Sequence, residues 1–199
     1  MSAAKIPQPI PYQGSKRRIA AEILARFPDR MTRLVEPFAG SAAISLATAA
    51  RGHAQRLWIN DANAPLIELW RAMIQHPGDL ADEYAELWQA QDGRERDFFD
   101  EVRDRFNQQH APADLLYLLA RCVKAAVRYN AQGHFNNTPD NRRRGTRPMQ
   151  MRRRILASAE LLRRRTRLTS WDYAKVLATC SGDDAIYMDP PYQGVSRGR

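Results

Sequence analysis

The most chemically distinctive segment of the chain is Asp-Pro-Pro-Tyr at 189–192, which directly follows the apolar run 185–188. Such a run predicts a buried strand, and open α/β sheets place their sites at the carboxyl ends of strands. The two prolines fix φ and carry no N–H, so the backbone is stiff and its carbonyls face outward. Asp189 and the Pro190 carbonyl could accept both hydrogens of an amino group, and the Tyr192 ring could stack on a planar base. A simple proline turn would explain the prolines but not the acid and the ring, so the segment predicts a site for an amino-bearing base.

A glycine and an acid mark a second candidate site. Gly40 lies in the segment VEPFAGS at 35–41, where a short strand is expected to lead into a helix, and glycine at that turn lets a ligand approach the backbone. Asp61 follows Gly40 by 21 residues and ends the next expected strand. An acid at this distance commonly binds ribose hydroxyls in nucleotide sites. One glycine and one acid are more often structural than functional, and the absence of a GxGxxG motif argues against a dinucleotide.

A third candidate is the segment YQGSK at 12–16, which leads into a helix expected over 15–27 with Ser15 as its N-cap. Lys16, Arg17 and Arg18 would occupy its first turn, where cations oppose the helix dipole. A bound carboxylate would reverse the sign of this effect for one of them. Screening by solvent is the equally simple alternative.

The charge of the chain points to a polyanion as its partner. The formal net charge is +9, and the stretch 142–167 holds eleven arginines against the single acid Glu160. Such a concentration of positive charge is typical of nucleic-acid binding. The alternative is a solvated helix face that aids solubility. The arginines are Arg142, Arg143, Arg144, Arg147, Arg152, Arg153, Arg154, Arg163, Arg164, Arg165 and Arg167.

The elements expected at the start of the chain form a βαβ unit. The apolar segment 34–38 predicts a strand, and 56–60 predicts a second one. Between them a helix is expected from Ser41, as its N-cap, through Ala50, with Gly52 just past its end. A strand, helix and strand in this order indicate a parallel sheet.

The middle of the chain predicts a helical insertion in this α/β core. Residues 65–165 show mostly helical periodicity, with one apolar stripe expected to run along a single helix over 115–127. The stretch 130–147 is rich in Asn, Gly, Pro and Arg and predicts a loop or short hairpin. Two further strands are then expected at 167–171 and 185–188.

Composition excludes several classes of protein. No apolar run is long enough to cross a bilayer, and the N-terminus lacks the apolar core of a signal peptide, so no membrane or export role is expected. Cys122 and Cys180 form no CxxC or Cys/His cluster, which argues against a disulfide framework and against a metal site. These features fit a protein of the reducing cytoplasm.

Taken in order, these segments resemble the Dam-like, D12-class, alpha-ordered DNA adenine-N6 methyltransferases over essentially the whole chain. The family opens with an aromatic-x-Gly-x-Lys segment, here 12–16, and continues with Phe-x-Gly, here 38–40. The acids after its second and third strands correspond to Asp61 and Asp172. Its RYNxxGxFN segment corresponds to 128–136, and DPPY ends the series.

The resemblance implies a Rossmann-like S-adenosylmethionine-dependent methyltransferase core with a helical target-recognition insertion. The core is expected at 1–64 and 166–199, and the insertion at 65–165. The family continues after DPPY with further strands, whereas seven residues follow here, so we expect an incomplete sheet that a missing C-terminal part or a complementing chain would finish. An uncovered strand of this kind is an aggregation hazard.

The resemblance also assigns roles to residues. The catalytic residues would be Asp189, Pro190 and Tyr192. The cofactor S-adenosylmethionine would be bound by Tyr12, Lys16, Phe38, Gly40, Asp61, Asp172 and Asp189, while Glu36 is either a ligand of its ammonium group or a structural acid. Double-stranded DNA would be contacted by Arg128, Tyr129, Asn130, Asn136, Arg142, Arg143, Arg144, Arg147, Arg152 and Arg153.

The implied reaction is direct methyl transfer to N6 of adenine in DNA, as in restriction-modification systems, with the base flipped out of the duplex. No metal and no covalent intermediate are required. Two alternatives remain open: cytosine-N4 methylation, which uses a motif more often beginning with Ser, and a non-catalytic or split DNA-binding fragment of such an enzyme.

Overall fold

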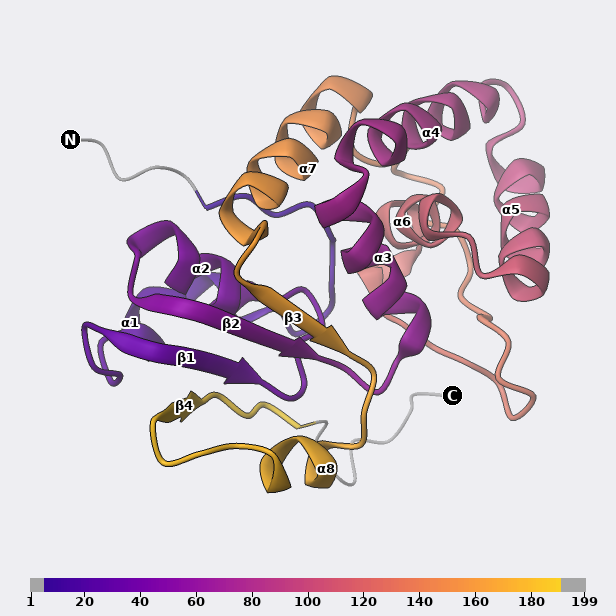
Figure 1. Cartoon of the computed structure of the whole chain (residues 1–199). Helices are drawn as coiled ribbons and strands as arrows, with labels where there is room; N and C mark the ends of the chain where they lie inside the picture. The colour runs from indigo at the N-terminus through magenta and orange to yellow at the C-terminus, as the bar shows by residue number, and fades with distance from the viewer. Residues whose placement is uncertain (1–5, 191–199) are drawn as a thin grey trace.

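The computed structural model describes residues 6–190 and contains a four-stranded parallel sheet in the order β3-β2-β1-β4 (Figure 1). Its strands are β1 (Met31–Glu36), β2 (Ala54–Asn60), β3 (Thr166–Thr169) and β4 (Asp184–Ile186). Because the strands are parallel, their carboxyl ends meet at one edge, and the predicted site residues Gly40, Asp61 and Asp189 follow those ends. The predicted fold class, an α/β parallel sheet flanked by helices, is confirmed.

The β1–α2–β2 unit forms as predicted but its helix begins differently. Helix α2 (Ala43–Arg51) ends at Gly52, whose φ of +67° is the left-handed conformation expected there. Ser41 is not its N-cap, because the Ser41 hydroxyl donates to the hydroxyl of Ser15 instead. In the first turn of α2, the backbone N–H of Ser45 donates to the carboxylate of Glu36.

The helices of the predicted insertion lie together beside the sheet (Figure 1). Proline stands in the first turn of several of them, where its missing N–H costs nothing and its fixed φ suits the helix. Their buried side chains join those of the sheet in one continuous hydrophobic cluster. The helices are α3 (Ala64–Gln75), α4 (Pro77–Ala90), α5 (Glu95–Gln109), α6 (Pro112–Arg121) and α7 (Pro148–Leu162).

The single helix predicted over 115–127 is wrong beyond Arg121. Helix α6 ends there, and a short 3-10 turn, η2 (Val123–Ala125), follows with Lys124 at a φ of +58°. The physical reason is backbone pairing with the returning loop: the Val123 N–H donates to the Thr138 carbonyl, and Cys122 pairs with Pro139 in an antiparallel bridge. The apolar stripe is therefore divided between a helix and an irregular segment.

The N-terminal helix is also shorter than predicted. The expected helix over 15–27 is instead a 3-10 turn, η1 (Lys16–Arg18), followed by α1 (Ala20–Leu24), with Ile19 at a non-helical φ of −110° between them. Ser15 makes no side-chain cap. Among residues 6–190, no helix is both long and apolar enough to span a bilayer.

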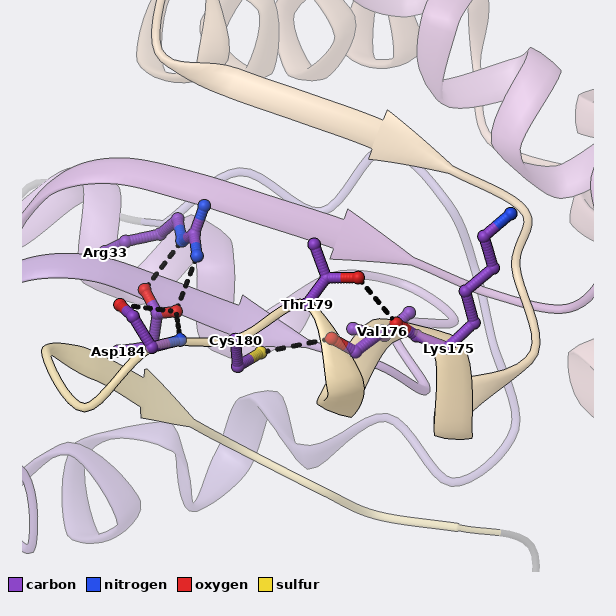
Figure 2. Close-up of polar contacts among 7 residues, drawn as sticks. Arg33, Lys175, Val176, Thr179, Cys180 and Asp184 are labelled. Carbon is purple, nitrogen blue, oxygen red and sulfur yellow. Dashed lines mark hydrogen bonds and ion pairs between the residues drawn. The ribbon is translucent and has the colours of Figure 1, made fainter.

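The second face of the sheet is covered by α8 (Tyr173–Ala178) and the connection to β4 (Figure 1). Trp58, Val35 and Val176 form a small buried cluster there. Figure 2 shows how the edge strand is fastened: the Arg33 guanidinium makes two hydrogen bonds to the Asp184 carboxylate, which joins β1 to β4. Asp184 also accepts from the backbone N–H of Ser181, so the turn before β4 is closed by the same carboxylate.

Candidate active site

The turn after β1 is held by the last residue of β2 and the acid that follows it. The Asn60 side chain donates to the Pro37 carbonyl, and the Asn60 carbonyl accepts from the Ala39 N–H, each at 2.9 Å. Asp61 Oδ2 then accepts from the Gly40 N–H, also at 2.9 Å. The loop 37–40 is therefore fixed at successive backbone atoms, as a site that must meet a ligand in one conformation requires.

Gly40 is required by two features of its surroundings. Its φ is +50°, which side chains rarely adopt, and a Cβ there would lie 2.9 Å from Cε1 of Tyr12. The Tyr12 ring thus rests directly on the glycine backbone. Burial raises the pKa of the Tyr12 phenol above its ordinary value, with Asp61 adding to the effect, so the ring stays neutral.

A pocket of about 430 Å³ opens at the carboxyl edge of the sheet. It brings together residues that are far apart in the chain, including most of the predicted cofactor-binding and catalytic residues. Asp172 does not line this pocket, and Tyr192 lies outside the described residues. The predicted site residues in its wall are Tyr12, Lys16, Phe38, Gly40, Asp61, Asp189 and Pro190.

Lys16 and Asp189 form an ion pair in the wall of this pocket. Both side chains are about three-quarters buried, and Lys16 also donates to the Gly14 carbonyl at 3.3 Å. The sequence suggested solvent or a bound carboxylate as the partner of Lys16, whereas its partner in the structure is the acid of the Asp-Pro-Pro-Tyr segment. The first and last chemical segments of the chain are therefore joined directly.

The two acids on the inner wall of the pocket have different partners. Asp61 accepts from two backbone N–H groups, those of Gly40 and Asn63, and burial still raises its pKa above the ordinary value. Glu36 accepts from both the N–H and the hydroxyl of Ser45 through one oxygen. Burial raises the pKa of Glu36 to about 7, although both hydrogen bonds oppose this. The partnership with Ser45 was not visible in the sequence, because nine residues and a turn separate the two.

Asp172 is placed at the start of α8 rather than in the pocket. Its carboxylate accepts from the Ala174 N–H at 2.8 Å and so caps the helix, and the residue is exposed. The next residue, Tyr173, lies against Phe38 with ring centroids 5.4 Å apart. The end of β3 therefore reaches the pocket through this ring contact.

The segment 128–136, which holds four of the residues predicted to contact DNA, forms a small hairpin-like loop, called the recognition loop below. Tyr129 and Phe135 pair in an antiparallel bridge, and the Asn130 side chain accepts from two N–H groups within the loop. Arg128, Asn130 and Asn136 are exposed. Tyr129 is half-buried, and its hydroxyl donates to the Asn63 side chain at 3.1 Å, which fastens the loop beside Asp61.

The arginines of 142–167 have three kinds of surroundings. Some contact carbonyls or aromatic rings of the protein: Arg165 donates to two backbone carbonyls, and the exposed Arg167 lies 4.2 and 4.7 Å from the ring centroids of Trp58 and Trp171. Those with a carboxylate partner are Arg143, Arg144 and Arg152. Within the described part of the chain, the exposed arginines without a carboxylate partner include Arg142, Arg147 and Arg153.

Comparison with known proteins agrees with this arrangement. The profile described as D12 class N6 adenine-specific DNA methyltransferase matches residues 12–199. The chain is 27% identical to a DNA N-6-adenine-methyltransferase of Escherichia phage P1, over 92% of this chain and 23% of that protein. It is 29% identical to the Retron Ec67 DNA adenine methylase of Escherichia coli, over 94% of this chain and 64% of that protein. A DNA adenine methylase of Haemophilus influenzae is 25% identical, over 91% of this chain and 62% of the relative.

The chain thus spans less than two thirds of the length of these curated relatives. The matched part nevertheless includes the glycine turn, the acid after β2 and the Asp-Pro-Pro-Tyr segment. The chain belongs to the D12 class N6 adenine-specific DNA methyltransferase family.

Proposed function

We propose that the chain carries the donor site and the base-binding site of an enzyme that transfers a methyl group from S-adenosylmethionine to N6 of adenine in double-stranded DNA. The observation that carries this proposal is the position of Asp189, paired with Lys16 in the wall of the pocket that also contains Gly40 and Asp61. The family and the names of the relatives support a methyl donor and a DNA substrate.

The pocket suits a donor of this size and polarity. Its volume of about 430 Å³ falls within the range of roughly 300–1,000 Å³ that is usual for small-molecule sites. Asp61 keeps lone pairs beyond those used by its two backbone partners, so its carboxylate can accept from ribose hydroxyls. Glu36 is turned toward Ser45, which favours the structural role for this acid. When bound, S-adenosylmethionine supplies an electrophilic methyl group at its sulfonium.

Asp189 and the Pro190 carbonyl would receive the target amino group. Their acceptors would bind the two hydrogens of N6 and so direct its lone pair toward the donor. Lys16 holds the Asp189 carboxylate in one position. Catalysis would then come chiefly from orientation and from placed charge. Tyr192, which lies outside the described residues, is proposed to stack on the flipped adenine.

The DNA surface is proposed to lie on the helical segment 65–165. Arg128, Asn130 and Asn136 are exposed on the recognition loop, and Tyr129 anchors that loop next to the pocket. Arg142, Arg147 and Arg153 have exposed side chains that are free to neutralise phosphates. The arginines paired with carboxylates, Arg143, Arg144 and Arg152, would have to exchange those partners for phosphates.

The test is mass spectrometry of nucleosides from duplex DNA incubated with the purified chain and isotope-labelled S-adenosylmethionine. We expect labelled N6-methyladenine, and its loss in Asp189→Ala. Asp183→Ala is the matched control, because Asp183 is an exposed acid in the turn before β4 and should leave the product unchanged. Labelled N4-methylcytosine in place of N6-methyladenine would show that the target base is cytosine. If neither labelled base is formed and the donor does not bind, the proposal is overturned.

A further inference from the structure

Asn60 is a fully buried polar side chain at the point where three strand ends meet. It is the last residue of β2 and has no exposed surface. Its amide donates to the Pro37 carbonyl at 2.9 Å and to the Trp171 carbonyl at 3.0 Å. Its oxygen accepts from the Trp171 N–H at 2.9 Å and from the Thr169 hydroxyl at 2.7 Å. All four hydrogen-bonding positions of the amide are therefore used.

Three of these bonds, with Pro37 and Trp171, join the segment after β1 to the segment after β3, and the fourth is made with Thr169, the last residue of β3. Pro37 precedes the glycine turn, and Trp171 precedes Asp172 and Tyr173. The two segments meet again at the pocket, where Phe38 and Tyr173 lie in ring contact. Since Phe38 lines the pocket, the separation of these segments determines the shape of its wall.

A second layer fixes the orientation of the Asn60 amide. Thr169 stands opposite Asn60 in the β2–β3 register, and its hydroxyl accepts from the indole N–H of Trp58 at 2.7 Å. Because that hydroxyl must then donate its own hydrogen to Asn60, the amide oxygen is directed toward Thr169 and the amide nitrogen toward the two carbonyls. The network thus has one consistent arrangement of donors and acceptors.

We infer that Asn60 is a positioning residue that sets the distance between the glycine turn and the segment after β3, and that it thereby determines affinity for the methyl donor. This inference rests on the proposed function. Asn60 does not touch the donor in this account; it acts through the Pro37 and Trp171 backbone. No other residue type offers two donors and two acceptor positions in the same planar group apart from Gln, whose extra methylene would not fit a side chain without exposed surface.

The experiment measures binding of S-adenosylhomocysteine, a stable product analogue of the donor, by calorimetry to the full chain. Asn60→Asp, which replaces the two donors by an acceptor, should weaken binding about tenfold or more, in line with a loss of roughly 1.4 kcal/mol per tenfold change. Gln91→Glu is the matched control, since Gln91 is also fully buried and also donates through its amide to two carbonyls, but lies in the helical segment away from the pocket. It should lower thermal stability without changing the affinity.

Two further variants keep the test decisive if Asn60→Asp does not fold. Thr169→Val removes the hydroxyl that orients Asn60 and should weaken binding several-fold, whereas Thr169→Ser keeps that hydroxyl and should restore it. Normal affinity in folded Asn60→Asp or in Thr169→Val, with the wild type binding well, would overturn the positioning role and leave the proposed function standing. No binding by the wild-type chain would overturn the proposed function itself.

Discussion

Glu36 is a carboxyl group placed where its ionisation is costly. Its side chain is buried, and its carboxylate accepts from the backbone N–H and the hydroxyl of Ser45. Burial raises the pKa of Glu36 to about 7 from an ordinary value of 4.5. Between these two pH values the folded state binds a proton that the unfolded state does not, so the free energy of unfolding falls as pH rises through this window.

Replacement of Glu36 tests this directly. Glu36→Gln cannot ionise, so its free energy of unfolding should lack the decline between pH 5 and 7 that the wild type shows, at about 1.4 kcal/mol for each unit of pKa difference. Urea unfolding at pH 5, 6, 7 and 8 measures both proteins. Glu160→Gln, at an exposed acid of α7, should keep the wild-type slope. Parallel curves for Glu36→Gln and the wild type would show that Glu36 is ionised throughout.

The role of Gly40 in donor binding can be separated from its role in stability by comparison with a second glycine. Gly40→Ala should lose affinity for the donor, because the new methyl group meets the Tyr12 ring and because Ala at a φ of +50° is strained. Gly93→Ala has the same kind of strain, at a φ of +74°, but nothing within 4 Å of its Cβ. Backbone strain alone should cost each variant about 1 kcal/mol of stability, and the contact with Tyr12 should add to the loss in Gly40→Ala. Calorimetry with the donor should separate them, and equal donor affinities would place the Tyr12–Gly40 contact outside the binding site.

At the scale of elements, the sequence was most informative where a segment depends on local chemistry. The strand predicted at 34–38 is found as β1, which begins three residues earlier and ends at Glu36. The helix ending at Gly52 and the position of Asp189 after the last strand also follow from apolar runs and turn residues. The end of α6 could not be predicted in this way, because the helix stops where Val123 pairs with Thr138. The hydrophobic periodicity of a segment carries no information about a partner fifteen residues away. The Lys16–Asp189 and Asn60–Trp171 contacts were missed for the same reason, since each joins residues more than a hundred positions apart.

The edge strand β4 offers a prediction at this scale. It has three residues, and the Arg33–Asp184 pair supplements its short ladder (Figure 2). The Asp184 side chain is 3% exposed, and its hydrogen bonds from Arg33 hold the pKa of that carboxyl below its ordinary value. Arg33→Met would leave this carboxylate without its guanidinium partner and should lower the free energy of unfolding at pH 7 by about 1–3 kcal/mol.

The pH dependence of this loss has a definite sign. A depressed pKa contributes stability above the unfolded pKa of the acid and loses it as pH falls through the folded value. The difference between Arg33→Met and the wild type should therefore shrink on acidification below about pH 4, the ordinary range of an aspartate. Arg71→Met is the control, because its pair with Glu68 is exposed and such pairs contribute about 0.5 kcal/mol or less. Equal losses in the two variants would assign no special role to the Arg33 contact.

At the scale of the whole molecule, the sheet and the helical segment share one hydrophobic cluster. Two hydrogen bonds also join the helical segment to the residues around the pocket: the Tyr129 hydroxyl donates to the Asn63 side chain, and the Gln13 N–H donates to the Ala125 carbonyl. Donor and DNA sites would therefore be built on one body. The division into a core of 1–64 and 166–199 and an insertion of 65–165 remains a prediction, as do the assigned contacts to DNA.

The net charge of +9 favours binding of the whole molecule to a polyanion such as DNA. Each phosphate that an arginine neutralises releases counterions, so the slope of log K against log salt measures the number of contacts, at about 0.9 per phosphate on duplex DNA. Arg147 and Arg153 are exposed and have no carboxylate partner among the described residues, so Arg147→Ala with Arg153→Ala should flatten the slope by up to about two units. Arg165 donates to the carbonyls of Leu161 and Ala49, so Arg165→Ala should lower stability and leave the slope unchanged.

Fluorescence anisotropy of a labelled duplex over a range of salt concentrations measures the slope for the wild type and for both variants. An unchanged slope in the double variant would return these arginines to a solvated surface, and an equal drop in Arg165→Ala would show that a general loss of charge, rather than contact with phosphates, governs binding.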